Sequence, residues 1–494
     1  MRSVDHRFRS LVGSRVLTVA ATLALAPSAG AQLVPLTELA APYLEVGEPG
    51  LYPGGANEPT GEALARALAR AAAVVPRDAT GAPAEGGWIG FVAVGMSNTN
   101  QEWSRFERES DRDGGHAARV VLVDAAQGGK DAFAMDEESD PYWALFDQRL
   151  ATAGVDPDQV QVVWLKQSVA GEQLVGDFPE RMQPLRDGLG AVVDLLAARC
   201  ANLQLVLASS RIWSSGSRRT FAYETAFAAK GLVADRLALP PEAGPWVGWG
   251  PYLWADGANP RADGLTWEPW DLEDDGVHPG PTAEWTVAQA LASHLVANAW
   301  TAPWYRGEGD ATLLALDAAA DAHVDPAVPD GTFGLEPLLR LDGARRVYAR
   351  FDLAAVEAPL LRAKLSFLAD PEAGLPPTDA FAVAPEAWSE ATIAWNNAPT
   401  PLLPALARVS TFSRGGAWAL DVTAHVAAAL AAGADAISFA LATPAPVVGP
   451  RAALAREAGE PPRLVLALGA PRPREPIFVG RFESGDTWPW LTSP

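Results

Sequence analysis

Four short and mainly apolar runs in the first half of the chain constrain its fold most. They lie at residues 88–95, 119–125, 160–166 and 203–210, with the sequences WIGFVAVG, RVVLVDA, VQVVWLK and LQLVLASS. A strand that is buried on both faces of a sheet has such a continuous apolar run. A segment with apolar residues at helical spacing lies between the third and fourth runs, at 178–200, and another lies at 281–300. Strands that alternate with helices predict an α/β domain, a parallel sheet with helices on both faces.

The pattern changes near residue 310. Strand-like segments become short and closely spaced, and turns that contain Pro or Gly separate them; they lie at 345–353, 360–370, 417–423, 436–443 and 463–468. This spacing predicts an all-β sandwich. The predicted organisation is therefore a leader at 1–31, an N-terminal segment at 32–85 that packs on the first domain, an α/β domain at 86–305, a sandwich at 310–468 and a Pro-rich tail at 469–494.

The N-terminus has the pattern of a secretion signal. Four arginines precede the apolar run Val16–Ala26, which is too short to span a bilayer, and Ala29-Gly30-Ala31 fits an A-x-A cleavage site. We therefore expect a secreted or extracytoplasmic protein that is cleaved after Ala31. No later stretch is long and apolar enough to predict a transmembrane segment. Cys200 is the single cysteine, so no intramolecular disulfide is expected.

The charge of the chain limits its partners. The formal net charge is −22, with 60 Asp and Glu against 38 Lys and Arg. A field of this sign repels the phosphate backbone of nucleic acid and an anionic membrane surface. Neither is an expected partner.

The ends of the predicted strands carry residues for acyl transfer. The active site of an open parallel sheet lies beyond the carboxyl ends of its strands. Ser97 follows the first strand, and Asp275 and His278 share a turn before the last helix. A serine hydroxyl needs a base to become a nucleophile, and histidine can remove its proton near neutral pH. A carboxylate on the other ring nitrogen fixes the tautomer, so the three residues form a candidate catalytic triad.

Acyl transfer also needs donors for the oxyanion. Gly128 and Gly129 follow the second strand, and Gln167 follows the third. A glycine has no side chain that could block the oxyanion, and the amide of Gln167 is a further donor. The sequence leaves these three residues open as oxyanion donors beside the N–H of Ser97.

The order of these blocks resembles the SGNH (GDSL-like) hydrolases, which carry Ser, Gly, Asn and D-x-x-H in that sequence. GMSN at 95–98 and AAQGG at 125–129 look most like the sialate O-acetylesterase and acetylxylan esterase branch. The resemblance implies a flavodoxin-like three-layer α/β/α fold and hydrolysis of esters, often acetyl groups on carbohydrate. The third block departs from the family, because WLKQS stands where G-x-N-D or W-x-Q-G-E is usual. Either Gln167 replaces the missing donor or Lys166 fills its space.

Residues 246–270 concentrate aromatic side chains before the catalytic turn, and exposed aromatic faces suit stacking on sugar rings. The alternative is that these rings pack the loop against the domain. Trp249 and Trp254 are the candidate sugar contacts, with Asn98 beside the nucleophile and Arg211 after the fourth strand as further candidate substrate-binding residues. Arg211 could instead pair with one of the many carboxylates.

The C-terminal region resembles the DNRLRE-type modules that are related to a carbohydrate-binding family. The resemblance rests on WSEATIAWNNAP at 388–399, YARFDL before it and the W-x-L-D-V-T piece after it. It implies a β-jelly-roll that binds polysaccharide or has a structural or adhesive role.

The predicted function is a secreted carboxylic-ester hydrolase, an acetyl esterase acting on carbohydrate. Its expected partner is a polysaccharide or other acetylated carbohydrate. No cofactor is needed, and no Cys/His cluster offers a transition-metal site. The alternative is a non-catalytic carbohydrate-binding or cell-surface adhesive protein on a hydrolase scaffold.

Overall fold

The computed structural model describes residues 33–469, with gaps at 113–114, 171–173, 308–311, 357, 371–372, 385–387, 410–416, 445–446 and 448. The predicted signal peptide and nearly all of the predicted tail lie outside the described residues. None of the described helices is long and apolar enough to span a lipid bilayer.

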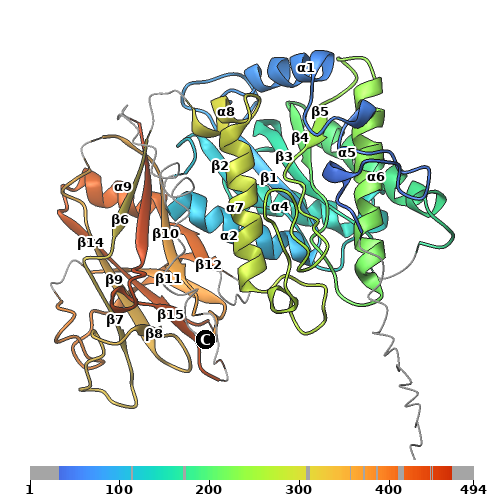
Figure 1. Cartoon of the computed structure of the whole chain (residues 1–494). Coiled ribbons are helices and arrows are strands. Elements are labelled where there is room, and N and C mark those ends of the chain that lie inside the picture. The colour runs from blue at the N-terminus through green and yellow to red at the C-terminus, as the bar shows by residue number, and fades with distance from the viewer. Residues whose placement is uncertain are drawn as a thin grey trace, which may run out of the picture. The chain divides into compact units, whose positions relative to one another are not determined.

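The N-terminal part is an α/β region with one parallel sheet. Its five strands are ordered β2-β1-β3-β4-β5, with β1 at Ile89–Gly95 paired parallel to both β2 and β3 (Figure 1). The other elements are α1 Gly61–Ala72, α2 Ser97–Arg112, β2 Val120–Asp124, α3 Ala132–Met135, α4 Pro141–Thr152, β3 Val160–Lys166, α5 Gln183–Arg199, β4 Leu205–Ala208, α6 Arg218–Ala238, β5 Trp246–Trp249, α7 Pro281–Ala297 and α8 Ala302–Arg306. This sheet confirms the predicted parallel α/β arrangement.

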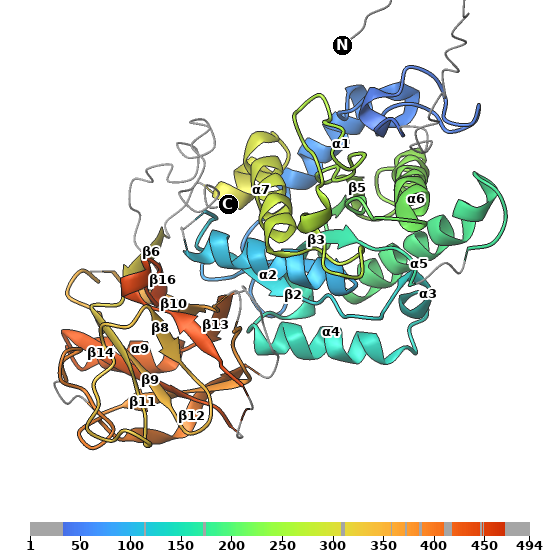
Figure 2. The same cartoon turned by 60° about the horizontal axis from the view of Figure 1, so that its bottom comes forward.

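Helices cover both faces of the sheet. Figure 2 shows α2 and α7 together on one face, with α4 and α5 on the opposite face. Every residue of β1 and β3 is buried, which explains why these strands have continuous apolar sequences. The carboxyl ends of the strands meet at one edge, where the predicted site residues follow β1, β2 and β3.

The sequence interpretation missed β5, because it placed the Trp246–Trp249 segment in a loop. This strand has only four residues, WVGW, and all of them are buried. Gly248 has no room for a side chain, since a Cβ there would lie 2.0 Å from an atom of the Trp246 ring. So short a strand, with a glycine inside it, has no pattern that distinguishes it from a loop.

The segment before α1 is bound to the end of the sheet at β5. The ring N–H of Trp249 donates to the carbonyl of Leu51 at 2.7 Å, and the backbone N–H of Trp249 donates to the Tyr52 hydroxyl at 3.0 Å. The Lys230 ammonium of α6 donates to two carbonyls of the same segment, those of Glu48 and Pro49, each at 2.7 Å. The segment therefore packs on this region.

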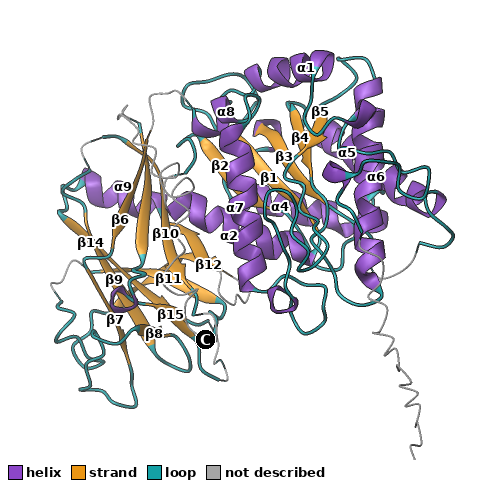
Figure 3. Cartoon of the chain, viewed as in Figure 1, coloured by secondary structure: helices purple, strands orange, loops and turns teal. Residues whose placement is uncertain are grey.

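The C-terminal part consists of antiparallel sheets, as predicted. One sheet has the order β13-β10-β16-β6, another has β12-β11-β14-β9-β7, and β15 and β8 form a small pair (Figure 3). The elements are β6 Thr312–Asp317, β7 Ala320–Val324, β8 Leu338–Arg340, β9 Arg346–Asp352, β10 Leu360–Leu368, β11 Thr378–Val383, β12 Pro401–Val409, β13 Ala417–Asp421, α9 Thr423–Ala431, β14 Ala436–Ala442, β15 Ala452–Leu454 and β16 Arg463–Leu468.

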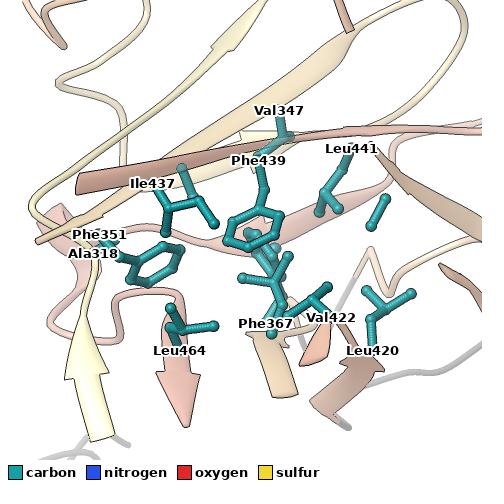
Figure 4. Packing of buried hydrophobic residues seen from close by; sticks show 14 of the residues in the cluster. Ala318, Val347, Phe351, Phe367, Leu420, Val422, Ile437, Phe439, Leu441 and Leu464 are labelled. Atoms are coloured by element: carbon teal, nitrogen blue, oxygen red, sulfur yellow. The ribbon is translucent and has the colours of Figure 1, made fainter. Parts of the chain in front are cut away.

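The two larger sheets share one hydrophobic core. Phe439 and Phe351 on β14 and β9 face Phe367 and Leu464 on β10 and β16, as Figure 4 shows. Each of these side chains is almost completely buried. Alternate residues of β9, β10, β14 and β16 point into this core, which is the pattern of a face-to-face sheet packing.

We expect Phe439→Ala to destabilise the C-terminal region by about 3–5 kcal/mol, because it removes a fully buried aromatic ring and leaves a cavity. Differential scanning calorimetry of the full chain would show this as a lower transition temperature. Leu403→Ala is the matched control, since Leu403 is 83% exposed. An equal loss for both variants would contradict this description of the core.

Candidate active site

Ser97 lies where β1 meets α2. The strand ends at Gly95 and the helix begins at Ser97, so the hydroxyl sits at the carboxyl edge of the sheet. A Cβ at Gly95 would lie 2.2 Å from Thr99 Oγ1 and 2.3 Å from the carbonyl oxygen of Lys166. Glycine is therefore required there, because only its absent side chain lets the first turn of α2 approach β3 this closely. Ser97 therefore lies at the positive end of the α2 dipole, where the first N–H groups of the helix have no acceptor within the helix.

The turn that carries Asp275 and His278 is tightly hydrogen-bonded. An isolated antiparallel β-bridge between Leu272 and Pro279 closes the turn. Within it, the N–H of Glu273 donates to the carbonyl of His278 at 2.9 Å. Gly276 has a φ of 67°, a conformation that glycine adopts without strain. The turn therefore presents Asp275 and His278 in a defined geometry.

Ser97, His278 and Asp275 form a continuous relay. Ser97 Oγ lies 2.8 Å from His278 Nε2, although the two residues are 181 positions apart. His278 Nδ1 lies 2.5 Å from Asp275 Oδ2. Ser97 and His278 are both partly exposed, so a substrate can reach the hydroxyl. This is the geometry in which histidine takes a proton from serine while the carboxylate holds the ring.

Hydrogen bonds keep the carboxylate of Asp275 ionised. Partial burial alone would raise its pKa. The backbone N–H of His278, the His278 ring and the backbone N–H of Val277 act in the opposite direction, and together they lower the pKa of Asp275 to about 2. Asp275 therefore carries a negative charge throughout the range in which a histidine base works, and can stabilise the imidazolium that forms.

Asn98 holds the two halves of the relay together. Its amide nitrogen donates to the carbonyl of Val277 at 2.9 Å, and its side chain is buried. Asn98 uses one of its two amide N–H groups within the protein, and its contact with substrate stays a prediction. It is a positioning residue that ties the start of α2 to the catalytic turn.

Of the three candidate oxyanion donors, Gly128 approaches the nucleophile. A Cβ at Gly128 would lie 3.5 Å from the Cβ of Ser97. Gly129 has a φ of 76°, and a Cβ at that position would meet nothing within 4 Å. Gly129 therefore adopts the positive φ that the turn after β2 needs. The backbone of Gly128 lies next to Ser97.

The structure gives Gln167 a different role from the predicted one. Its Nε2 donates to the carbonyl of Lys130 at 3.1 Å and contacts Met135 Sδ at 3.0 Å, and its Oε1 accepts from the N–H of Ser168 at 2.9 Å. The Lys130 carbonyl and the Met135 sulfur occupy its two N–H donors, and the bond from Ser168 fixes the orientation of the amide. Gln167 therefore anchors the turn after β3 and has no N–H left for an oxyanion.

Lys166 forms a buried ion pair that the sequence did not reveal. Its ammonium lies 2.9 Å from Glu102 Oε1, and both side chains are almost completely buried. A lysine in an apolar strand requires such a partner, because an uncompensated buried charge is costly. The lysine at the end of VQVVWLK indicates that a carboxylate must lie near its ammonium. The sequence does not indicate that this carboxylate is Glu102 of α2.

Most of the aromatic side chains at residues 246–270 are buried and pack within the protein. Trp249 and Trp254 are 2% and 0% exposed, so the prediction that they contact substrate is wrong for both. Trp249 is held by the N-terminal segment, and Trp254 packs on the Tyr223 ring at 4.6 Å between centroids. The other buried members are Trp246, Tyr252 and Trp267.

Trp270 differs from the rest of the cluster because 73% of its surface is exposed. It lies in the 3-10 turn Pro269–Asp271, directly before the catalytic turn. The neighbouring Asp271 is fixed, since its carbonyl accepts from the N–H of Gly280 at 2.7 Å. An exposed indole on a fixed turn beside the relay can stack on a sugar ring.

Arg211 follows β4 and is partly buried. Its charge interacts with those of Glu102, Arg218 and Asp275, so it lies within electrostatic range of the buried ion pair and of the catalytic turn. It therefore lies on the same side of the sheet as the relay.

One family model matches the C-terminal part of the chain. The family model of carbohydrate-binding module family 96 matches residues 313–467. That range covers the antiparallel region, and the match connects this region with carbohydrate. No curated protein matches the chain in sequence.

Two solved structures show weak overall likeness. One, described as "The active site of a carbohydrate esterase displays divergent catalytic and non-catalytic binding functions", is 15% identical over 44% of this chain and 71% of that chain, with a TM-score of 0.25. Another, described as "Crystal structure of CapF with inhibitor 3-isopropenyl-tropolone", is 10% identical over 78% of this chain and 98% of that chain, with a TM-score of 0.11.

We expect Asp275→Asn to slow labelling of Ser97 by a fluorophosphonate probe by about 10³–10⁴-fold, because the ring would lose its carboxylate and the correct tautomer. The rate of labelling is followed on intact protein by mass spectrometry. Asp274→Asn is the control, since Asp274 is an exposed neighbour in the same turn. Equal rates for the two variants would show that Asp275 does not activate Ser97.

Proposed function

We propose that the protein is a serine esterase that removes acyl groups, acetyl groups above all, from carbohydrate. The observation that carries this proposal is the relay of Ser97, His278 and Asp275, with contacts of 2.8 Å and 2.5 Å. Gly128 beside Ser97 supports it, because the backbone there can donate to an oxyanion.

The arrangement of the sheet is consistent with the SGNH resemblance. The order β2-β1-β3-β4-β5 is the order of flavodoxin-like sheets. Ser97 after β1, Gly128 after β2 and the D-x-x-H turn before α7 occupy the places that the SGNH pattern assigns to them. The departure at the third block leaves the oxyanion to backbone donors, since the amide of Gln167 is engaged elsewhere.

In the proposed reaction, Ser97 Oγ attacks the ester carbonyl while His278 Nε2 accepts its proton. The oxyanion is stabilised by the N–H groups of Ser97 and Gly128, and the imidazolium by Asp275. His278 then gives the proton to the departing sugar hydroxyl, which leaves an acyl group on Ser97. Water, deprotonated by His278, hydrolyses this acyl-enzyme and regenerates the serine.

The match to carbohydrate-binding module family 96 supports a polysaccharide as the substrate. A binding module on the same chain raises the local concentration of substrate at the active site. We propose that the protein acts outside the cytoplasm, where such polymers occur, on the basis of the leader at residues 1–31.

The test is hydrolysis of 4-nitrophenyl acetate and acetylated xylan by the full chain and by Ser97→Ala. We expect the variant to lose about 10³–10⁶-fold in kcat, because no other group can form the acyl-enzyme. Ser104→Ala, on the same helix, serves as control and should retain activity. If wild type were inactive on both esters but bound the polymer, the proposal would give way to the non-catalytic binding protein.

We further expect Trp270→Ala to raise KM for acetylated xylan about 3- to 30-fold with little change for 4-nitrophenyl acetate, because loss of one stacking face costs roughly 1–2 kcal/mol. Steady-state kinetics on both substrates measure the difference. Leu68→Ala removes an exposed apolar side chain on α1 and should alter neither KM. An unchanged KM for the polymer in Trp270→Ala would exclude Trp270 as a sugar contact.

A further inference from the structure

Two arginines lie in the segment that leads from β4 to the catalytic turn. Arg211 follows the end of β4, and Arg218 is the first residue of α6. Between them, the N–H of Ser215 donates to the carbonyl of Gly276 at 2.9 Å, which fastens this segment to the turn that carries Asp275 and His278. Arg218 is also among the electrostatic neighbours of Arg211. The two guanidinium groups therefore lie within electrostatic range of each other, on a segment that is bonded to the catalytic turn.

Neither guanidinium has a hydrogen-bond or ion-pair partner within the part of the chain that the structure describes. The adjacent Arg219 shows the contrast, because it makes a bidentate pair with Asp256 at 2.6 Å. Arg186 likewise pairs with Asp235, and Arg199 with Asp147. The chain has 60 acidic residues against 38 basic ones, so carboxylate partners are abundant. Two unpaired arginines side by side are therefore an exception that calls for a ligand.

The carboxylates near Arg211 are already engaged. Glu102 lies 2.9 Å from the ammonium of Lys166. Asp275 accepts from the His278 ring and from two backbone N–H groups. The guanidinium of Arg211 therefore has no carboxylate hydrogen-bonded to it near the catalytic turn, and Arg218 adds repulsion rather than compensation. Two like charges held together in this way are stabilised when an anion binds between them.

We infer that Arg211 and Arg218 bind an anionic group of the substrate, so that the esterified carbohydrate is an acidic polymer whose sugars carry carboxylate or sulfate groups. The inference rests on the proposed esterase function and names its substrate class. A guanidinium presents parallel N–H donors that match the oxygens of either group. The net charge of −22 makes such a local site necessary, because the protein as a whole repels an acidic polymer.

The experiment compares kcat/KM of the full chain on three acetylated galactose-based polymers. These are acetylated galactan, which is neutral, acetylated polygalacturonate, which carries carboxylates, and acetylated carrageenan, which carries sulfates. We expect wild type to prefer at least one acidic polymer over galactan by about 10-fold or more, and to lose the preference as salt is raised. The better acidic polymer identifies the anionic group.

Arg211→Gln should lower the ratio of acidic to neutral kcat/KM by about 10- to 100-fold, mainly through KM, because a charged hydrogen-bonded contact is lost. Arg218→Gln should have a smaller effect of about 2- to 5-fold, since Arg218 is exposed. Arg211→Lys keeps the positive charge but loses the parallel N–H donors of the guanidinium. Its ratio of acidic to neutral kcat/KM should lie between those of wild type and Arg211→Gln. Arg199→Gln is the control, because Arg199 ends α5 at the opposite edge of the sheet, and its ratio should equal that of wild type.

Two outcomes separate this inference from the proposed function. Hydrolysis without any preference for an acidic polymer, or a preference that survives in Arg211→Gln, would overturn the inference and leave the esterase function standing. Inactivity of wild type on all three polymers and on 4-nitrophenyl acetate would remove the esterase function, and the inference with it. If Arg211→Gln does not fold, Arg211→Lys and Arg218→Gln decide by the same ratio.

Discussion

Parallel pairing of β1 with the strands on either side of it is the constraint on which the α/β region depends. Parallel strands all end at the same edge, so the segments that follow β1, β2 and β3 are brought together although they are far apart in the sequence. Gly95 then lets α2 begin within contact of the end of β3. The nucleophile, the glycine turn and the buried Lys166–Glu102 pair all take their positions from this junction. A side chain at Gly95 would displace them together.

The apolar runs predicted this sheet well, and the failures have identifiable physical causes. A strand that is buried on both faces must be apolar throughout, so β1 and β3 could be recognised from sequence alone. β5 could not, because its burial is supplied by partners distant in sequence, such as the Tyr52 hydroxyl. The C-terminal strands β6, β7, β8, β11, β12 and β15 were also missed. In two of them the residue types give a reason, because β11 contains two alanines and β12 two alanines and two prolines, and neither residue favours a strand.

The candidate site shows the same division between residue type and environment. Ser97, Asp275 and His278 could be chosen because triad chemistry needs these side chains in a known order, and the structure brings the three together. Four other candidate residues have side chains that suit binding, yet each is buried and contacts other parts of the protein. They are Trp249, Trp254, Asn98 and Gln167. Whether an aromatic ring or an amide is free depends on partners from other elements. Only Trp270 of the aromatic cluster retains an exposed face, and the sequence had no signal that separated it from its neighbours.

The hydrogen bond from Asn98 to the carbonyl of Val277 has a consequence for how the site responds to motion. The hydroxyl and the imidazole belong to segments 181 positions apart, and slow fluctuations of the sheet would ordinarily change their separation. Because Asn98 directly follows the nucleophile, and Val277 directly precedes His278, this bond couples the two segments next to the reacting atoms. The bond therefore restrains the separation of the serine hydroxyl and the imidazole. Motions of the surrounding loops that change substrate entry would then have less effect on the distance over which the proton is transferred.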